Sequence, residues 1–490
     1  MVMIEPIEVV PVDEVGKIHF IAIGGSGMSG IARLYAEHGI PTSGSDRSDS
    51  NTLKSLQRLG IQTYVGHDEA QLGDADTVVI SSAIREENVE LAAARRKGLR
   101  VWHRSAALAA LMLGKRAVAV AGTHGKTTTT AMTAVMLAAA GREPSYVIGG
   151  PLSTTGVSSA WGSGEAFVIE ADESDGSFLQ YPTEIAVITN IEADHLINWG
   201  TPAAYAGGFK QFATSATVKT VVINVDDPGT RALADELAEE VANGTQSVRL
   251  IRYGESPDAD VRITEVRSRP FGIAATITFG DESGPIELQV PGNHNLANAS
   301  AAYAVGRSLG LSHDEAVKAL AQFEGTLRRF QLITDTDGVR VFDDYAHLPT
   351  EIRAALTAAR RATEAGNEAT GLSGRLIACF QPHLYSRTID FVEEFGEVLT
   401  LSDIAVVNDV DGAREDPVPG ITGQLVADAA IRHGCAEVHY VPEKYDLPDA
   451  LNELAKPGDL IITLGCGDVT IVGPLLADLL RQRVKASDVE

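Results

Sequence analysis

Apolar and polar positions along this chain form short hydrophobic runs, each followed by a longer stretch with helical spacing. In the first segment, Ile18–Ile23 and Thr77–Ile80 are predicted to be buried strands, and Gly30–His38 and Asn88–Lys97 are predicted to be helices. Strands that alternate with helices form parallel sheets covered by helices. We expect this first α/β domain to end at about Gly114.

The same alternation continues, so we predict an α/β protein of three domains in series, at residues 1–114, 115–327 and 328–490. The central domain is expected to contain strands, a β-rich insert and a helix, in the order Ala117–Ala121, Ala166–Glu170, Ile185–Thr189, Val221–Asn224, Val261–Val290 and Asn295–Leu309. The last domain is expected to contain strands at Val339–Phe342, Arg375–Phe380, Ile404–Asn408 and Leu460–Leu464. We expect Thr363–Gly374 to be a flexible surface loop.

The sequence VAGTHGKTTTT at residues 120–130 joins a predicted strand to a predicted helix. Gly122 and Gly125 allow the backbone to curl around one anion, while Lys126 and Thr127 suit a terminal phosphate and its Mg²⁺. The usual phosphate-loop pattern has glycine where Val120 stands. The order of strand, loop and helix still favours ATP binding over a simple glycine-rich turn.

Composition and charge narrow the class of protein. The 490 residues include 40 basic and 66 acidic side chains, which gives a net charge of −26. This balance argues against nucleic acid or an anionic membrane surface as the main partner. No apolar stretch reaches membrane-spanning length, Met1–Lys17 lacks the pattern of a secretory signal, and the three cysteines lack zinc-like spacing. We therefore expect a cytoplasmic protein without disulfides.

A glycine-rich turn, GGSGMSG at residues 24–30, follows the first predicted strand and opens a helix. Gly25, Gly27 and Gly30 satisfy the dinucleotide fingerprint, and Asp46 stands where a ribose-binding acid is expected. NAD fits this pattern. The diphosphate of another nucleotide fits equally well, because backbone N–H groups and the helix dipole do the binding.

Four carboxylates lie within six residues at the end of the strand Ala166–Glu170, and they belong to Glu170, Asp172, Glu173 and Asp175. Acids that follow a buried parallel strand lie where such sheets bind ligands. A solvated acidic turn is the alternative. Because so many carboxylates would repel each other without a cation, we predict a metal site.

Polar side chains also follow the next predicted strand, at Asn190, Asp194 and His195. A lone histidine is more often structural than a ligand. Beside Asn190 and Asp194, His195 suits a second metal.

Two later motifs leave their function open. His294, Asn295 and Asn298 begin a helix, where the asparagines either cap it or reach an adenine edge. Arg328 and Arg329 lie at the junction of the second and third domains, where arginines can clamp a phosphate.

Polar residues of the third domain again follow predicted strands. His347 could receive a proton near neutral pH, and Arg387 could bind a carboxylate in a bidentate manner. Cys466 has no base near it in sequence, so we interpret it as a packing residue.

Together these motifs resemble those of the Mur ligase family, and the resemblance covers nearly everything from Ile18 onward. The motifs are GGSGMSG at 24–30, GTHGKTT at 122–128, EADESD at 170–175, TNIE at 189–192, DDYAHLPTE at 343–351 and QPH at 381–383. The resemblance implies a Rossmann-like UDP-binding domain, a central phosphate-loop ATPase domain and a Rossmann-like domain that closes the site. It also favours uridine diphosphate over NAD at the first turn, and accounts for Val120.

The resemblance further implies an ATP-dependent ligase of peptidoglycan precursor synthesis, with UDP-N-acetylmuramate and L-alanine as substrates and Mg²⁺ as the metal. Implied UDP-sugar residues are Gly25, Ser26, Gly27, Met28 and Asp46. Implied ATP residues are Gly122, Thr123, His124, Gly125, Lys126, Thr127, Thr128, His294, Asn298 and Arg329. Implied metal ligands are Thr127, Glu173 and His195, and implied amino-acid-binding residues are Tyr345, His347 and Arg387. The expected catalytic residues are Lys126, Glu173, His195, His347 and Arg387.

Three positions depart from the family's pattern. Family members usually have a second histidine at Leu348, an acid at Ile197 and alanine at Cys466. No lysine is a clear candidate for modification, and Lys210 is the nearest in place. The alternatives are a family ligase that accepts a peptide or another amino acid, an NAD-dependent oxidoreductase, and a nucleotide-sensing protein without turnover. We expect a monomer or homodimer.

Overall fold

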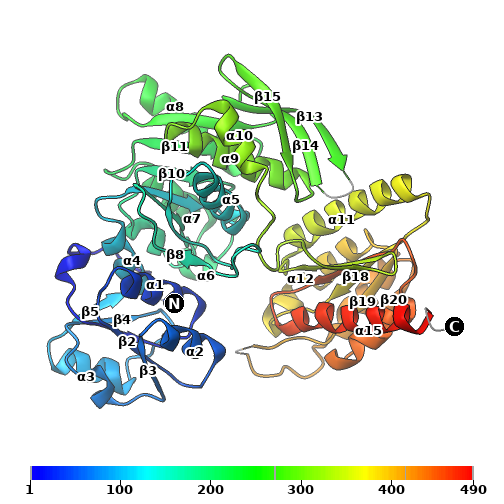
Figure 1. Ribbon diagram of the computed structural model, residues 1–490, viewed down its shortest axis with the longest axis horizontal. Coiled ribbons are helices and arrows are strands. Elements are labelled where there is room, and N and C mark those ends of the chain that lie inside the picture. Colours follow the sequence, from blue (N-terminus) through cyan, green and yellow to red (C-terminus); the bar gives the residue numbers. More distant parts are fainter. Residues whose placement is uncertain (1–2, 270–271, 414, 488–490) are drawn as a thin grey trace. The chain divides into compact units, whose positions relative to one another are not determined.

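The computed structural model describes residues 3–269, 272–413 and 415–487, in which three sheets follow one another along the chain (Figure 1). The first has five parallel strands in the order β3-β2-β1-β4-β5. Its elements are β1 (Ile18–Ile21), α1 (Ser26–Glu37), β2 (Thr42–Asp46), α2 (Asn51–Arg58), β3 (Gln62–Val65), β4 (Thr77–Ile80), α3 (Val89–Arg96), β5 (Arg100–His103) and α4 (Arg104–Met112). Strand order reverses beside β1, so the glycine turn that follows β1 lies at the switch point where such sheets bind ligands.

The second sheet has ten strands in the order β15-β14-β13-β12-β11-β10-β6-β9-β7-β8. Its elements are β6 (Arg116–Ala121), α5 (Lys126–Ala139), β7 (Ser145–Val147), β8 (Ser159–Ala160), β9 (Ala166–Glu170), β10 (Ile185–Ile188), α6 (Leu196–Trp199), α7 (Pro202–Ala213), β11 (Thr220–Asn224), α8 (Pro228–Ala242), β12 (Arg249–Gly254), β13 (Val261–Arg269), β14 (Gly272–Phe279), β15 (Glu282–Leu288), α9 (Asn293–Ser308) and α10 (His313–Leu320). Strand β6 pairs in parallel with β9 on one side and β10 on the other. The three segments that follow these strands therefore meet at one edge of the sheet.

The third sheet has six strands in the order β16-β17-β21-β18-β19-β20, in which β16 is antiparallel to β17 and the other neighbouring strands are parallel. Its elements are β16 (Gln331–Thr336), β17 (Val339–Asp344), α11 (Pro349–Thr370), β18 (Leu376–Phe380), α12 (Tyr385–Leu399), β19 (Ile404–Val407), α13 (Gly423–Arg432), β20 (Val438–Tyr440), α14 (Leu447–Leu454), β21 (Leu460–Leu464) and α15 (Val472–Ser487). The predicted α/β class is confirmed.

Two predictions about individual elements are wrong. Thr363–Gly374 is not a loop throughout, because α11 continues to Thr370 with Ala362 and Thr363 buried on its inner face. Helix α1 begins at Ser26, four residues before the predicted start, so the glycine turn itself forms the first turn of the helix.

The described residues form two compact units. One contains residues up to Thr264 together with Ile277–Gly284 and Ala297–Gln322, and the other contains Glu265–Thr276, Pro285–Leu296 and the residues from Phe323 onward. Within the first unit, one apolar core runs from the first sheet into the second, and α4 is buried from Ser105 to Met112. None of the described helices has the length and apolar character needed to cross a membrane.

Candidate active site

The loop after β6 curls as its glycines predict. Gly122 and Gly125 have positive φ angles of 138° and 81°, and a Cβ at Gly122 would overlap the Thr189 hydroxyl. A Cβ at Gly125 would lie 2.7 Å from Asn298 Oδ1 on helix α9. Both glycines are therefore required by a positive φ and by a close neighbour.

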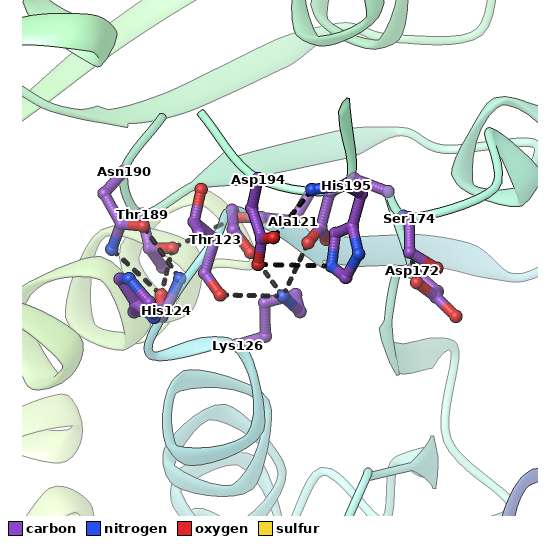
Figure 2. Close-up of polar contacts among 12 residues, drawn as sticks. Ala121, Thr123, His124, Lys126, Asp172, Ser174, Thr189, Asn190, Asp194 and His195 are labelled. Atoms are coloured by element: carbon purple, nitrogen blue, oxygen red, sulfur yellow. Dashed lines mark hydrogen bonds and ion pairs between the residues drawn. The ribbon is translucent and has the colours of Figure 1, made fainter. Parts of the chain in front are cut away.

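The segment after β10 holds this loop from the side (Figure 2). Asn190 Oδ1 accepts from His124 N at 2.8 Å, and Asn190 Nδ2 donates to His124 O at 3.0 Å. The Thr189 hydroxyl also donates to His124 O, at 2.6 Å. Because both ends of the Asn190 amide bond His124, Asn190 supports the phosphate loop.

Lys126 begins helix α5 and forms an ion pair with Glu173 from the turn after β9. Its ammonium donates to Glu173 Oε1 at 3.0 Å, to Thr123 O at 3.1 Å and to Gly122 O. Burial raises the pKa of Glu173 to about 7, although the Lys126 charge opposes that shift. A partly buried cation at a helix N-terminus is suited to a phosphate.

The expectation that the four neighbouring carboxylates need an external cation is wrong for most of them. Asp172 accepts from Arg104 Nη2 at 2.7 Å, Glu170 accepts from a backbone N–H, and Asp175 accepts from Ser82 and from a backbone N–H. Burial would raise the pKa of Asp172, but the Arg104 charge and the hydrogen bonds from Ser174 lower it below its ordinary value. The protein's own donors thus satisfy these acids.

Glu173 is the exception, and it is the residue that fits a metal. Its side chain is buried, and Oε2 has no hydrogen-bond partner among the described residues. The neighbouring Thr127 is also buried, in the first turn of α5. In the described part of the chain, no three His, Cys, Asp or Glu side chains are arranged to hold a metal alone. Such a set fits Mg²⁺ that takes its remaining ligands from phosphates and water.

His195 caps the short helix α6 with a left-handed φ of 53°. Its Nε2 lies 3.5 Å from Asp194 Oδ2, and its imidazole is partly exposed. Figure 2 shows the side chains of Asp194 and His195 pointing toward the end of Lys126. Ile197, at the position where the family usually has an acid, is 92% exposed. It supplies no ligand, and Asp194 is the one acidic partner of His195 among the described residues.

The glycine turn after β1 is held by the acid at the end of β2. Asp46 Oδ2 accepts from Gly24 N at 2.9 Å, so Asp46 shapes the turn. Gly25 is the N-cap of α1, and Ser26 and Gly27 follow it in the first turn. The Met28 side chain packs into the core, so only its backbone N–H is available to a ligand.

The asparagine motif after β15 divides between two tasks. Asn298 lies within helix α9 and is buried, and its Oδ1 accepts from the Thr129 hydroxyl at 3.1 Å. It therefore contacts the phosphate-loop helix and does not cap its own. Asn295 donates to Pro291 O at 2.6 Å, within the turn that opens α9. His294 is exposed in the second unit.

The two arginines before β16 also have different surroundings. Arg328 donates to Gly465 O at 2.6 Å and to Gly467 O at 2.9 Å, so it anchors the turn after β21. The guanidinium of Arg329 makes no hydrogen bond or ion pair within the described residues and lies 5.0 Å from the Tyr345 ring centre. Of the two, Arg329 is the one available to a ligand.

His347 follows β17 and faces an acid one helical turn later. Its Nδ1 lies 3.2 Å from Glu351 Oε2 and 3.1 Å from Tyr345 O. Burial lowers the pKa of His347, and the Arg387 charge adds to that shift while Glu351 opposes it. The imidazole is therefore neutral near pH 7 and can accept a proton. The guanidinium of Arg387 makes no hydrogen bond or ion pair with another described residue.

Cys466 lies in the turn that Arg328 anchors. Burial raises the pKa of its thiol to about 11, which keeps the thiol protonated at neutral pH. This agrees with a packing role and not with a nucleophile.

Two contacts at the edge of the second sheet, where the phosphate loop and the turn after β9 meet, were not predicted from the sequence. Arg104 pairs with Asp172, 68 residues away, and no local pattern signals that contact. The segment before β1 also contacts the acidic residues at 170–175, called the acid turn from here on, since Ile4 N donates to Asp175 O at 2.8 Å. The pair of His347 with Glu351 was also not predicted, although Glu351 ends the DDYAHLPTE motif. Its spacing of four residues from His347 is the signal that could have revealed the pair.

A parallel α/β architecture with a phosphate loop on its central sheet defines a multidomain nucleotide-binding protein. Three family models match in order: the Mur ligase family catalytic domain at residues 17–116, the Mur ligase middle domain at 120–306 and the Mur ligase glutamate ligase domain at 328–467. The chain belongs to the Mur ligase family, as the motifs predicted, with three domains in series.

Curated relatives cover almost the whole chain. A protein from Cutibacterium acnes named UDP-N-acetylmuramate–L-alanine ligase is 58% identical over 476 residues, covering 97% of this chain and 98% of the relative. A protein of the same name from Thermobifida fusca is 46% identical over 484 residues, covering 98% and 100%. The crystal structure of UDP-N-acetylmuramate-alanine ligase from Thermotoga maritima is similar, with a TM-score of 0.77, 27% identity and coverage of 95% and 99%.

Proposed function

We propose that this protein is an ATP-dependent ligase that joins L-alanine to the lactyl carboxylate of UDP-N-acetylmuramate in peptidoglycan precursor synthesis. The observation that carries the proposal is the full-length similarity to relatives of that name, at 46–58% identity in the two cases above. The Lys126–Glu173 pair at the phosphate loop supplies the matching chemistry. We also propose domain boundaries near residues 114 and 327.

We propose the following residue roles from the contacts of each group and from the family resemblance. Lys126 and the N–H groups of the loop, residues 122–128, bind the ATP phosphates, with Asn298 supporting the loop from behind. Mg²⁺, held by Glu173, Thr127 and His195, would offset the negative charge that builds as phosphoryl group and carboxylate meet. We also propose that His294 and Arg329 bind ATP, as the family resemblance implies. The first turn of α1 binds the UDP-sugar diphosphate.

The reaction begins with a poor acceptor, because a carboxylate resists attack by an amine. The lactyl carboxylate attacks the γ-phosphorus of ATP, which forms an acyl phosphate and releases ADP. Lys126 stabilises the charge on the transferred group, and loop N–H groups orient it. The acyl phosphate then carries phosphate as a good leaving group.

The second step forms the amide. Arg387, whose guanidinium has no partner among the described residues, binds the L-alanine carboxylate, and we propose Tyr345 as a further amino-acid-binding residue. The amine attacks the acyl carbon, the tetrahedral intermediate collapses and phosphate leaves. The neutral imidazole of His347 accepts the proton that the amine loses.

Choice of the amino acid tests the proposed substrate. Purified protein with ATP, Mg²⁺ and UDP-N-acetylmuramate should release phosphate fastest with L-alanine, compared with glycine, L-serine, D-glutamate and a tripeptide that begins with L-alanine. Phosphate release with the peptide but not with L-alanine would favour a peptide-accepting member, such as the murein peptide ligase of Psychrobacter arcticus, whose structure is 25% identical with a TM-score of 0.64. ATP binding without any release would contradict an enzyme.

Replacing His347 by glutamine should lower kcat by about a hundredfold, the lower range for a general base. Since the pKa of His347 lies below its ordinary value, the wild-type rate should fall only at acidic pH, where the imidazole becomes protonated. The pH–rate profile of the variant should lack this fall at acidic pH, its acidic limb. His433→Gln, a surface histidine paired with Glu393, is the control and should keep it. A limb that persists in His347→Gln would point to another group, such as Asp344, whose pKa burial raises to about 6.

A further inference from the structure

Arg104 begins helix α4 and contacts two parts of the site that are far apart in sequence. Its Nη2 donates to Asp172 Oδ2 at 2.7 Å, in the turn that also carries Glu173. Its Nη1 lies 3.6 Å from the position that a Cβ on Gly27 would occupy, in the first turn of α1. The guanidinium thus lies between the glycine turn of the first sheet and the acid turn of the second.

Most of the hydrogen-bonding capacity of Arg104 is unused within the described residues. A guanidinium has five N–H donors, and the Nη2 bond to Asp172 is the single hydrogen bond that its side chain makes there. By contrast, Arg231 on the same unit binds Asp258 through both terminal nitrogens, at 2.9 and 3.1 Å. A purely structural ion pair would be expected to use that bidentate geometry.

The location of these free donors suits an anion. The first turn of α1 presents the backbone N–H groups for which a helix has no carbonyl partners of its own, and the positive end of a twelve-residue helix. Asp172 is also held by Ser174 N at 3.0 Å, so its carboxylate can keep Arg104 in place while the remaining donors face a ligand. The side chain of Arg104 is 24% exposed, which leaves it accessible from one side.

We propose that Arg104 binds an oxyanion of the UDP-sugar substrate. This inference rests on the proposed function. The substrate has to extend from its diphosphate at α1 to its lactyl carboxylate near Lys126 and Glu173, and Arg104 lies between these two points. Either oxyanion has the chemistry that a guanidinium recognises, so the experiment separates the two.

The test is calorimetric titration of the full-length protein with UDP-N-acetylmuramate, without ATP. Arg104→Gln should weaken binding by about 10- to 100-fold, the range for a hydrogen bond to a charged group. Arg104→Lys, which keeps the charge but loses the planar donors, should fall between wild type and Arg104→Gln. The matched control is Arg33→Gln, since Arg33 lies on α1, is also 24% exposed and pairs with Glu37 on the same helix. It should bind within about twofold of wild type, as surface pairs contribute little.

Titration with UDP-N-acetylglucosamine, which lacks the lactyl ether, distinguishes the two oxyanions. Equal weakening for both ligands assigns Arg104 to the diphosphate, and weakening only for UDP-N-acetylmuramate assigns it to the carboxylate. Unchanged affinity in folded Arg104→Gln, or an equal loss in Arg33→Gln, would overturn the inference. Should Arg104→Gln not fold, wild-type affinity in Arg104→Lys would overturn it as well. Failure of the wild-type protein to bind either ligand would instead contradict the proposed function.

Discussion

Replacing Lys126 by alanine is expected to lower kcat by about a thousandfold or more, as for loss of a charged group that stabilises phosphoryl transfer. The Lys126 ammonium has carbonyl and carboxylate partners and a side chain only 17% exposed, so water cannot substitute for it at the same place. Phosphate release with saturating ATP, UDP-N-acetylmuramate and L-alanine is the measurement.

The same Lys126 variant should still bind the UDP-sugar with largely intact affinity, measured by calorimetry. The glycine turn after β1 belongs to a different sheet from the phosphate loop, and Asp46 fixes that turn independently. Lys219→Ala serves as the control, since its ammonium is 74% exposed and lies 3.5 Å from Glu184. Loss of both turnover and UDP-sugar binding would contradict the proposal that the two nucleotide sites are separate.

Much of the fold could be predicted because buried parallel strands leave a strong sequence signal. The predictions for Thr77–Ile80, Ala166–Glu170 and Leu460–Leu464 match the structure residue for residue, and each is a short apolar run bounded by polar residues or glycine. The order of strands in the chain also placed the phosphate loop and the acid turn at strand ends. Pairing of β6 with β9 then brings them together.

The end of helix α11 could not be predicted from the same kind of signal. Its last turns are polar and contain Gly366, which reads locally as a loop. In the structure a Cβ on Gly366 would lie 2.6 Å from Arg340 Nη2, so this glycine reflects a close neighbour and not a break in the helix. Only tertiary packing distinguishes the two interpretations.

Charge at the acid turn was misjudged for a related reason. The local sequence shows four carboxylates and no cation, whereas Arg104 and Lys126 approach from other elements. Sequence proximity overestimates the repulsion, since ion pairs between distant segments are invisible in it. One carboxylate oxygen of this turn, Glu173 Oε2, is buried and still has no hydrogen-bond partner in the part of the chain that the structure describes.

The second large effect is expected when this oxygen is replaced. Glu173→Gln should lower kcat by about a hundredfold or more and raise the Mg²⁺ concentration needed for half-maximal rate. Glutamine keeps the shape of the side chain but removes the negative charge that a hard cation prefers. Steady-state rates across a Mg²⁺ titration at saturating substrates measure both quantities. Glu184→Gln is the control, since this 19% exposed carboxylate pairs with Arg116 on the same sheet.

The Mg²⁺ titration separates two roles that Glu173 could have. Its Oε1 accepts from Lys126, so the substitution also removes the counterion of a cation that binds phosphate. Loss of that counterion alone would lower kcat at every Mg²⁺ concentration and leave the half-maximal concentration unchanged. A metal ligand at Oε2 requires the half-maximal concentration to rise as well. An unchanged value in Glu173→Gln would therefore exclude Glu173 as a metal ligand and leave it the task of positioning Lys126.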